Sequence, residues 1–380
     1  MALRSILQFA ALAWWQSKVA DATILPVVGP QRFDVAITTT SLVDFDRLDP
    51  FAKDGRARSI MVTGFNPVAS CHQKHVQPYM PPSTAAFQDD KFSAYGLPNG
   101  SFKSLQLEAC EDIARGRGCS SGPPPLVLFS GALSTSRLIY SSMLQGIAAA
   151  GYLVVSIDHP YDSDIVEFPN GTTIAGLDID SDADLELALT TRVQDIAFVR
   201  DQMANASIAA KLFSGHKLRR HNSKTAVIGH SFGGAAAASA MLEDSSIKAG
   251  LNIDGSMFGS VLEAGLDRPF VLLGHENKTQ ATDPSWKAIW PQLRAFKKEF
   301  EVKGTAHYSF SDLPLITAAL GFQNSLPEEV GQVLGTIEGH RMTGIIVAYV
   351  TMFIDMVFKS GSEIGLVESN ADFPEVVVVA

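Results

Sequence analysis

Short apolar runs alternate with helical patterns along the chain from about residue 124 onward, and this alternation limits the possible folds more than any other feature. Apolar runs bounded by Gly and Pro, with helical stretches between them, are typical of parallel strands joined by helical crossovers. Residues 125–130, 138–150 and 152–157 form one strand–helix–strand unit of this kind. We therefore predict an α/β fold with a mostly parallel central sheet flanked by helices.

Further elements follow the same pattern. A helix over 185–203 is predicted by apolar residues at Leu189, Val193, Ile196, Val199 and Met203, which would form one buried stripe. Near the N-terminus, two runs are expected to form an antiparallel pair at the sheet edge. The predicted strands outside the first unit are 33–39, 59–63, 225–229, 247–253, 270–273 and 299–305.

The size of the chain favours one large domain. Its 380 residues, 46% of them hydrophobic and 18% charged, can bury a sizeable core, and we predict a single domain over 23–380. Residues 66–122 are richer in Pro, Gly, Ser and charge and contain all three cysteines. This segment is predicted to be an insertion, and the sequence leaves open whether it is a lid or a cover for the sheet edge.

The N-terminus resembles a secretory signal peptide over residues 1–22. Arg4 supplies a positive charge, 5–15 supply a short apolar stretch, and Ala20-Asp21-Ala22 offers small residues for cleavage; a buried first helix is the alternative. Four Asn-x-Ser/Thr sites are compatible with a glycosylating secretory route, so we expect a secreted glycoprotein. The candidate glycosylation sites are Asn99, Asn170, Asn205 and Asn277.

The three cysteines, Cys71, Cys110 and Cys119, allow at most one intramolecular disulfide. Pairing of Cys110 with Cys119 closes the shortest loop, and pairing of Cys71 with either of them is nearly as favourable. No spacing of Cys and His suggests a metal site, so no metal is expected.

Charge and hydropathy narrow the range of partners. The net charge of −10 disfavours binding to nucleic acids or to anionic membranes, because both require a basic face. The apolar stretch 344–358 is short and contains Asp355, so a buried core helix is expected and no stable membrane span. Neutral or zwitterionic small molecules remain as substrates, and the oligomeric state stays open.

The motif Gly229-His230-Ser231-Phe232-Gly233-Gly234 lies between a predicted strand and an Ala-rich predicted helix over 235–241. A Gly-x-Ser-x-Gly pattern at a strand-to-helix turn is typical of a nucleophile elbow, where small residues let neighbouring backbone approach and the helix N-terminus favours negative charge. Ser231 is therefore the candidate nucleophile. The alternative is a glycine-rich turn with an ordinary serine.

A serine nucleophile needs a histidine base, and in folds with this elbow the acid and then the histidine follow the serine along the chain. Three histidines lie downstream of Ser231. His307 follows the predicted strand 299–305, from which a loop could reach the elbow, whereas His275 precedes that loop and His340 begins a terminal helix. His307 is therefore the candidate base. The order excludes His72, His75, His159, His216 and His221.

The acid is less clearly marked. Asp254 ends the predicted strand after the elbow, while Glu276 and Asp283 follow the next strand and are its rivals. A carboxylate at a strand end is often only a turn former, and Asp254-Gly255 would make a good turn. The residue pattern alone places Asp254 only slightly ahead.

Three segments resemble the platelet-activating factor acetylhydrolase family of plasma and isoform II type, which is an α/β-hydrolase family. They are 229–234, then 251–258 (LNIDGSMF) and 304–312 (GTAHYSFSD), which correspond to the elbow, acid and histidine segments. The resemblance assigns the acid role to Asp254. Residues 126–142 resemble the oxyanion loop of the family, although the sequence has Gly131-Ala132 where the family usually has His-Gly. The whole resemblance extends from about residue 32 to 358.

The resemblance implies a carboxylic-ester hydrolase that prefers short acyl groups, such as the acetyl ester of a phospholipid. By position, the backbone N–H groups of Leu133 and Phe232 would form the oxyanion hole. An acyl-enzyme on Ser231 requires no metal or organic cofactor. Two alternatives stay open: a broader esterase or lipase with the same machinery, and a protein of this fold that binds a partner and catalyses nothing.

Overall fold

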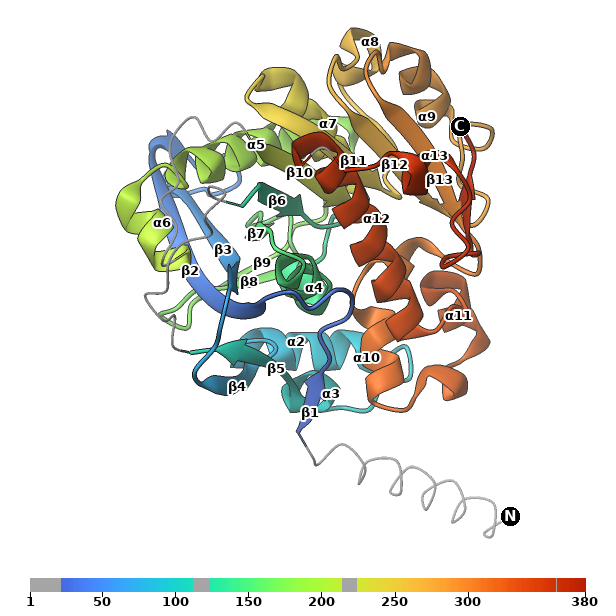
Figure 1. Ribbon diagram of the computed structural model, residues 1–380. Helices are drawn as coiled ribbons and strands as arrows, with labels where there is room; N and C mark the ends of the chain where they lie inside the picture. The colour runs from blue at the N-terminus through green and yellow to red at the C-terminus, as the bar shows by residue number, and fades with distance from the viewer. Residues whose placement is uncertain (1–21, 112–123, 214–223, 360) are drawn as a thin grey trace, which may run out of the picture.

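The structure is a computed structural model that describes residues 22–111, 124–213, 224–359 and 361–380 (Figure 1). Its core is a nine-stranded sheet with the order β14-β13-β12-β11-β10-β6-β7-β3-β2. The strands from β13 to β7 in this order run parallel to one another, and this confirms the predicted α/β fold. The bounds are β6 Leu126–Ser130, β7 Leu153–Asp158, β10 Thr225–His230, β11 Ile247–Ile253, β12 Phe270–His275, β13 Lys297–Val302 and β14 Val376–Val378.

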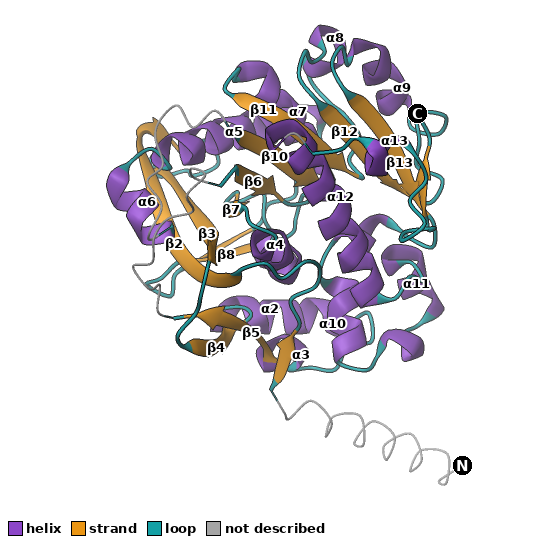
Figure 2. Cartoon of the chain, in the orientation of Figure 1, coloured by secondary structure: helices purple, strands orange, loops and turns teal. Residues whose placement is uncertain are grey.

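Helices cover both faces of the sheet (Figure 2). On one face lie α4 (Ser141–Ala149) and α12 (Gly339–Lys359), and on the other α5 (Asp182–Gln202) and α7 (Phe232–Glu243). Strand residues alternate between the two faces as the pleat requires: Val127 packs with the α4 and α12 side and Leu128 with the α5 and α7 side. Because both faces are buried, the central strands are continuous apolar runs, which is the signal that the sequence shows.

The N-terminal strands form the predicted antiparallel edge. β2 (Asp34–Leu48) pairs with β3 (Ala57–Val68), and β3 pairs antiparallel with β7. Both strands extend well beyond the predicted ranges 33–39 and 59–63. The prediction stopped early because polar and charged residues continue along the exposed side of β2.

Two strands of the predicted insertion, β4 and β5, join β1 from the N-terminal part of the chain in a small sheet with the order β1-β5-β4, at the lower side of Figure 1. Its disulfide joins Cys71 to Cys110, so the shortest closure, Cys110 with Cys119, is not the one formed, and Cys119 lies outside the described residues. Sequence distance alone was a poor guide because β4 and β5 pair and bring the two ends of the segment together. The elements are β1 Thr23–Leu25, β4 Lys74–Pro78, α2 Pro82–Ser93, α3 Ser101–Ser104 and β5 Leu105–Cys110.

Two predicted boundaries need correction. The helix predicted over 138–150 begins as a 3-10 turn, η1 (Arg137–Tyr140), because Ser136 caps that turn, and α4 continues only from Ser141. The strand predicted over 299–305 ends at Val302 as β13. The remaining elements are β8 Ile165–Glu167, β9 Thr173–Ala175, α6 Ala206–Leu212, α8 Val261–Ala264, α9 Pro284–Ile289, η2 Trp290–Gln292, η3 His307–Phe310, α10 Leu313–Ala319, η4 Gln323–Ser325, α11 Glu328–Leu334 and α13 Ile364–Val367.

Within the described ranges, one helical stretch, Glu328–Lys359, is long and apolar enough to cross a membrane, and 56% of its most apolar window is buried inside the protein. Core helices of soluble proteins also have this length and composition, so the stretch is weak evidence for a span. Its main part, α12, packs on the sheet and beside α4, as the prediction of a buried helix over 344–358 requires.

Candidate active site

The predicted elbow is a tight turn between β10 and α7. Ser231 has φ 57° and ψ −126°, a conformation that costs a residue with a side chain on the order of 1–3 kcal/mol. The turn brings backbone so close that a Cβ on Gly229 would lie 1.9 Å from the carbonyl oxygen of Gly233, and a Cβ on Gly233 would lie 2.1 Å from that of Ser130. Glycine is therefore required at both positions.

Three predicted side chains form one hydrogen-bonded chain. Ser231 follows β10, Asp254 follows β11 and His307 begins η3 after β13, so all three lie at the carboxyl ends of parallel strands. The distance from Ser231 Oγ to His307 Nε2 is 2.9 Å, and that from His307 Nδ1 to Asp254 Oδ2 is 2.5 Å. The structure thus brings together the three residues that the sequence singled out.

Asp254 is fully buried, and its backbone N–H and both of its carboxylate oxygens form hydrogen bonds. Its φ is 59°, and its N–H donates to the carbonyl oxygen of Leu273 (2.8 Å). Oδ1 accepts from the backbone N–H of His275 (2.8 Å) and from His275 Nδ1 (2.6 Å). Burial would raise the pKa of Asp254, but the hydrogen bonds from His275 and His307 outweigh it and hold the pKa below its usual value. The carboxylate is therefore ionised and fixed in orientation.

The rival acids lie elsewhere. Glu276 accepts from the N–H of Gly304 at 3.0 Å, and Asp283 caps α9 and binds Lys278 at 2.5 Å. Neither carboxylate bonds to His307. His340, the last of the candidate bases, pairs with Glu338 at the surface.

His230, the residue before Ser231, is buried beside Tyr140 and His307. Its Nδ1 lies 2.9 Å from Tyr140 Oη, and its Nε2 lies 2.9 Å from the carbonyl oxygen of His307. Burial lowers the pKa of His230 to about 3, so the ring is neutral. A neutral ring with its proton on Nε2 donates to the carbonyl of His307 and so holds the segment that carries the His307 side chain.

The two predicted oxyanion donors, Leu133 and Phe232, lie in the loop after β6 and at the start of α7. Neither backbone N–H has a hydrogen-bond partner within the described residues. Other donors of the same loop are occupied: the N–H of Ala132 donates to Tyr140 Oη (3.0 Å), and that of Ser134 donates to the carbonyl of Asp162 (2.9 Å).

An apolar cavity of about 280 Å³ adjoins the segments that carry His307 and Leu133, although neither of these residues lines it. Tyr308, next to His307, and Thr135, two residues after Leu133, line it, and their hydroxyl groups lie 3.3 Å apart. The insertion contributes one wall of the cavity through α2, and its β5 residue Cys110 packs against Ala36 of β2, at the edge of the large sheet. Further lining residues are Gln88, Lys91, Phe92, Tyr95, Leu97, Ile139, Asp164, Leu313, Thr317, Leu326, Val330, Val333 and Leu334.

In the described part of the chain, three residues lie close enough together to hold a metal ion. The ligand atoms of His230, Asp254 and His307 are within 4.8 Å of one another. Both ring nitrogens of each histidine already have hydrogen-bond partners, so the grouping is accounted for by the hydrogen-bonded chain.

Sequence reasoning missed several polar residues in and around the site. His275 was considered only as a base, yet it binds Asp254; its place at the end of β12, beside β11, was the available signal. Arg192 and Asp195 lie among the apolar residues that form the buried side of α5, and charges at such positions indicate a buried polar network.

Comparisons with known proteins identify the family. The family described as "Platelet-activating factor acetylhydrolase, isoform II" matches residues 106–170 and 203–326. A probable 1-alkyl-2-acetylglycerophosphocholine esterase of Arthroderma benhamiae is 31% identical over an alignment of 384 positions that covers 95% of each chain. The platelet-activating factor acetylhydrolase of Cavia porcellus is 24% identical over an alignment of 221 positions that covers 52% of this chain and 50% of that one.

A solved structure extends the comparison to the fold. The ferulic acid esterase from Streptomyces cinnamoneus superposes with a TM-score of 0.78 and 28% identity, over 94% of this chain and 100% of that chain. The resemblance stated from the three sequence segments is confirmed. The chain belongs to the platelet-activating factor acetylhydrolase (isoform II) family of α/β-hydrolases, and it is an ester hydrolase.

Proposed function

We propose that Ser231 is the nucleophile, His307 the general base and Asp254 the supporting acid of a carboxylic-ester hydrolase that works through an acyl-enzyme. The observation that carries the proposal is the continuous hydrogen-bonded chain from the Ser231 hydroxyl to the Asp254 carboxylate. It begins at a serine in a strained turn at the start of a helix, where access and local charge favour a nucleophile.

In the first half-reaction, Ser231 Oγ attacks the ester carbonyl carbon while its proton moves to His307 Nε2. The carbonyl electron pair becomes an oxyanion, which the N–H groups of Leu133 and Phe232 stabilise. Collapse of this intermediate breaks the bond to the alcohol, which leaves with the proton from His307. Water then attacks the acyl-enzyme by the same route, releases the acid and restores Ser231.

Asp254 acts through His307. Its carboxylate fixes the tautomer that places the proton on Nδ1, so Nε2 is free to accept the serine proton. It also stabilises the imidazolium that forms during each half-reaction.

The substrate that we favour is a short-chain ester, such as the acetyl ester of an ether phospholipid. The name of the relative from Arthroderma benhamiae supports this choice, and the apolar cavity lined by Tyr308, the residue after His307, offers space for an apolar part of the substrate. The second candidate is a broader esterase, which is favoured by the likeness to a ferulic acid esterase over nearly the whole chain.

The catalytic assignment is tested with a fluorophosphonate probe and p-nitrophenyl acetate. The probe is expected to label Ser231 stoichiometrically, and Ser231→Ala is expected to lower kcat by at least about 10⁴-fold. Ser130→Ala is the matched control, because Ser130 is also hydrogen-bonded to a histidine but is completely buried. Unchanged turnover in Ser231→Ala would remove the proposal.

The substrate choice is tested by comparing kcat/KM for three esters: a 2-acetyl ether phosphocholine, its long-chain 2-acyl analogue and methyl ferulate. A preference of more than about tenfold for the acetyl ester supports the first candidate. Comparable values for all three support the broader esterase.

Secretion is part of the proposal. All four candidate glycosylation sites, Asn99, Asn170, Asn205 and Asn277, are exposed, and a disulfide between Cys71 and Cys110 is favoured in an oxidising compartment. The protein made in its own cells is expected to lack residues 1–22 and to shift in mass after endoglycosidase treatment. Intact Met1 on an unglycosylated, cell-retained product would contradict secretion.

A further inference from the structure

The loop after β6 has almost every backbone polar group occupied. Across the three peptide units from Gly131 to Ser134 there are three carbonyl groups and three N–H groups. Five of these six groups have hydrogen-bond partners. They are the carbonyls of Gly131, Ala132 and Leu133 and the N–H groups of Ala132 and Ser134. Within the described residues, only the N–H of Leu133 has none.

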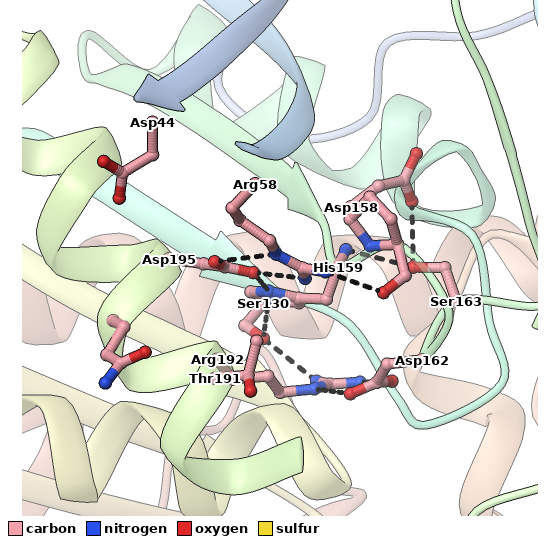
Figure 3. A network of polar contacts seen from close by, with 12 residues as sticks. Asp44, Arg58, Ser130, Asp158, His159, Asp162, Ser163, Thr191, Arg192 and Asp195 are labelled. Carbon is pink, nitrogen blue, oxygen red and sulfur yellow. Dashed lines mark hydrogen bonds and ion pairs between the residues drawn. The ribbon is translucent and has the colours of Figure 1, made fainter. Parts of the chain in front are cut away.

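One side chain from α5 supplies two of these contacts. Arg192 Nη1 donates to the carbonyl oxygen of Gly131 at 2.5 Å, and Nη2 donates to that of Ala132 at 3.3 Å. Nη1 also donates to Ser130 Oγ at 3.0 Å, as Figure 3 shows. The guanidinium is 1% exposed and forms a bidentate pair with the buried carboxylate of Asp162. Its charge is therefore balanced without a ligand.

The direction of these contacts determines where the free N–H points. All peptide bonds of the described residues are trans, and in a trans peptide the C=O and the N–H point in opposite directions. Because the carbonyl of Ala132 points toward Arg192, the N–H of Leu133 points away from Arg192. The preceding peptide unit is held at both ends in the same way, by Arg192 on the Gly131 carbonyl and by Tyr140 Oη on the Ala132 N–H.

Arg192 also contacts the second oxyanion residue. Its guanidinium carbon lies 5.1 Å from the ring centroid of Phe232, so one side chain touches both segments that would form the oxyanion hole. The planar fork of arginine can bind two carbonyls and a carboxylate at once, whereas the single ammonium of lysine cannot reproduce this geometry.

We propose that Arg192 is a positioning residue that orients the oxyanion loop, so that the Leu133 N–H faces the reacting carbonyl beside Phe232. The inference rests on the proposed function, because it assumes that the two N–H groups bind the oxyanion. Arg192 touches no reacting atom. It acts by fixing the peptide planes before substrate arrives, which is the condition for an oxyanion hole to lower the barrier.

The test compares Arg192→Lys with Arg58→Lys. Arg58 is a matched control, since it is equally buried in the same network (Figure 3) and binds Asp195 and Asp49 but not the oxyanion loop. For p-nitrophenyl acetate, Arg192→Lys is expected to lower kcat by about 100-fold with KM nearly unchanged, because the loss of one oxyanion donor costs about that much. Arg58→Lys is expected to change kcat less than threefold.

A second measurement isolates the oxyanion. A trifluoromethyl ketone adds reversibly to Ser231 Oγ and leaves an oxyanion in the hole, so its inhibition constant in Arg192→Lys should rise by about the same factor as kcat falls. An equal loss of kcat in Arg58→Lys, or a loss confined to KM, would overturn the proposal. If Arg192→Lys fails to fold, Tyr140→Phe is the second variant. It removes the hydrogen bond from the Ala132 N–H to Tyr140 Oη, at the other end of the peptide unit whose carbonyl Arg192 binds. It is expected to lower kcat about tenfold, and an unchanged kcat there would also overturn the proposal.

Fluorophosphonate labelling separates this inference from the proposed function. Labelling of wild-type Ser231 with no kcat difference between Arg192→Lys and Arg58→Lys removes only the role of Arg192. Absence of labelling in the wild type removes the nucleophile itself.

Discussion

The described part of the protein contains two serine–histidine–aspartate chains with the same order of hydrogen bonds. In the first, Ser231 Oγ lies 2.9 Å from His307 Nε2, and His307 Nδ1 lies 2.5 Å from Asp254. In the second, Ser130 Oγ lies 3.0 Å from His159 Nε2, and His159 Nδ1 lies 2.9 Å from Asp195 (Figure 3). By residue type, by the ring nitrogen that faces each partner and by distance, the two chains are nearly equivalent.

Their surroundings separate them. Ser130 is completely buried at the end of β6 and accepts a hydrogen bond from Arg192, whereas Ser231 is in a strained turn and the His307 side chain is 39% exposed. A buried hydroxyl has no route to substrate, and a donor on its oxygen competes for the electron pair that attack requires. A serine–histidine–aspartate chain is therefore not sufficient for catalysis without access, a strained turn and oxyanion donors.

The largest difference between the two chains is expected when each aspartate is replaced by asparagine. Asp254→Asn is expected to lower kcat by about 10⁴-fold with little effect on stability, because an amide favours the wrong tautomer of His307. Asp195→Asn is expected to leave kcat within about threefold but to lower the free energy of unfolding by about 3–5 kcal/mol, because Arg58 loses a buried partner. Steady-state kinetics and urea denaturation measure the two effects.

Loss of activity in Asp195→Asn with an intact fold would contradict this assignment, because the buried chain would then contribute to turnover. The role assigned to Asp254 would then need to be shared.

Much of the first chain could be predicted from sequence because its parts follow strand ends. The Gly-x-Ser-x-Gly motif marks a strand-to-helix turn, and the order of acid and histidine narrows the partners. The choice of Asp254 over Glu276 needed the family resemblance, because both residues end neighbouring strands and only the three-dimensional position of His307 distinguishes them.

The second chain could not be predicted in this way. Its members come from β6, the loop after β7 and the middle of α5, and no local motif joins Ser130, His159 and Asp195. The order rule also excluded His159 as a base for Ser231, which agrees with its hydrogen bonds to a different serine. The disulfide shows the same limit, since the register of β4 on β5 brings Cys71 to Cys110 and the spacing of cysteines does not contain that register.

The two histidines should differ in their effect on acid stability. Burial lowers the pKa of His159 below its usual 6.5, although Asp195 opposes this shift. Below pH 6.5 the unfolded chain therefore takes up a proton that the folded chain does not, so stability falls as pH falls, by up to about 1.4 kcal/mol per pH unit for one such group. Urea denaturation of His159→Gln between pH 5 and 6.5 is expected to show a shallower slope than that of wild type.

Two other groups help to interpret that measurement. His230, with a pKa lowered to about 3, contributes in the same window and is present in both proteins, so some slope should remain. Asp195 has a lowered pKa as well, and its contribution is lost only below about pH 4. An identical slope in wild type and His159→Gln would mean that His159 is protonated in the folded protein.

Each aspartate also has a second side-chain partner, and these two partners differ in burial. Asp195 binds the buried Arg58, whereas Asp254 binds the half-buried ring of His275 at 2.6 Å. We expect His275→Ala to lower kcat about fivefold with KM unchanged, because the backbone N–H of residue 275 still holds Asp254 but the carboxylate loses one donor. His275→Gln retains a side-chain donor and should recover part of the loss. Equal kcat values for wild type and His275→Ala would make the ring contact incidental to turnover.

The smallest effect is expected at Glu276, the rival acid. Its carboxylate is partly exposed and accepts a hydrogen bond from the N–H of Gly304, and a glutamine keeps an oxygen for that bond. Glu276→Gln should therefore change kcat less than about twofold, within the range of ordinary surface substitutions. The measurement is kcat on p-nitrophenyl acetate beside Asp254→Asn. If Glu276→Gln lost more than tenfold in kcat while Asp254→Asn stayed active, Glu276, in the loop after β12, would be the acid. Asp254, whose carboxylate binds both His275 and His307, would then have a purely structural role.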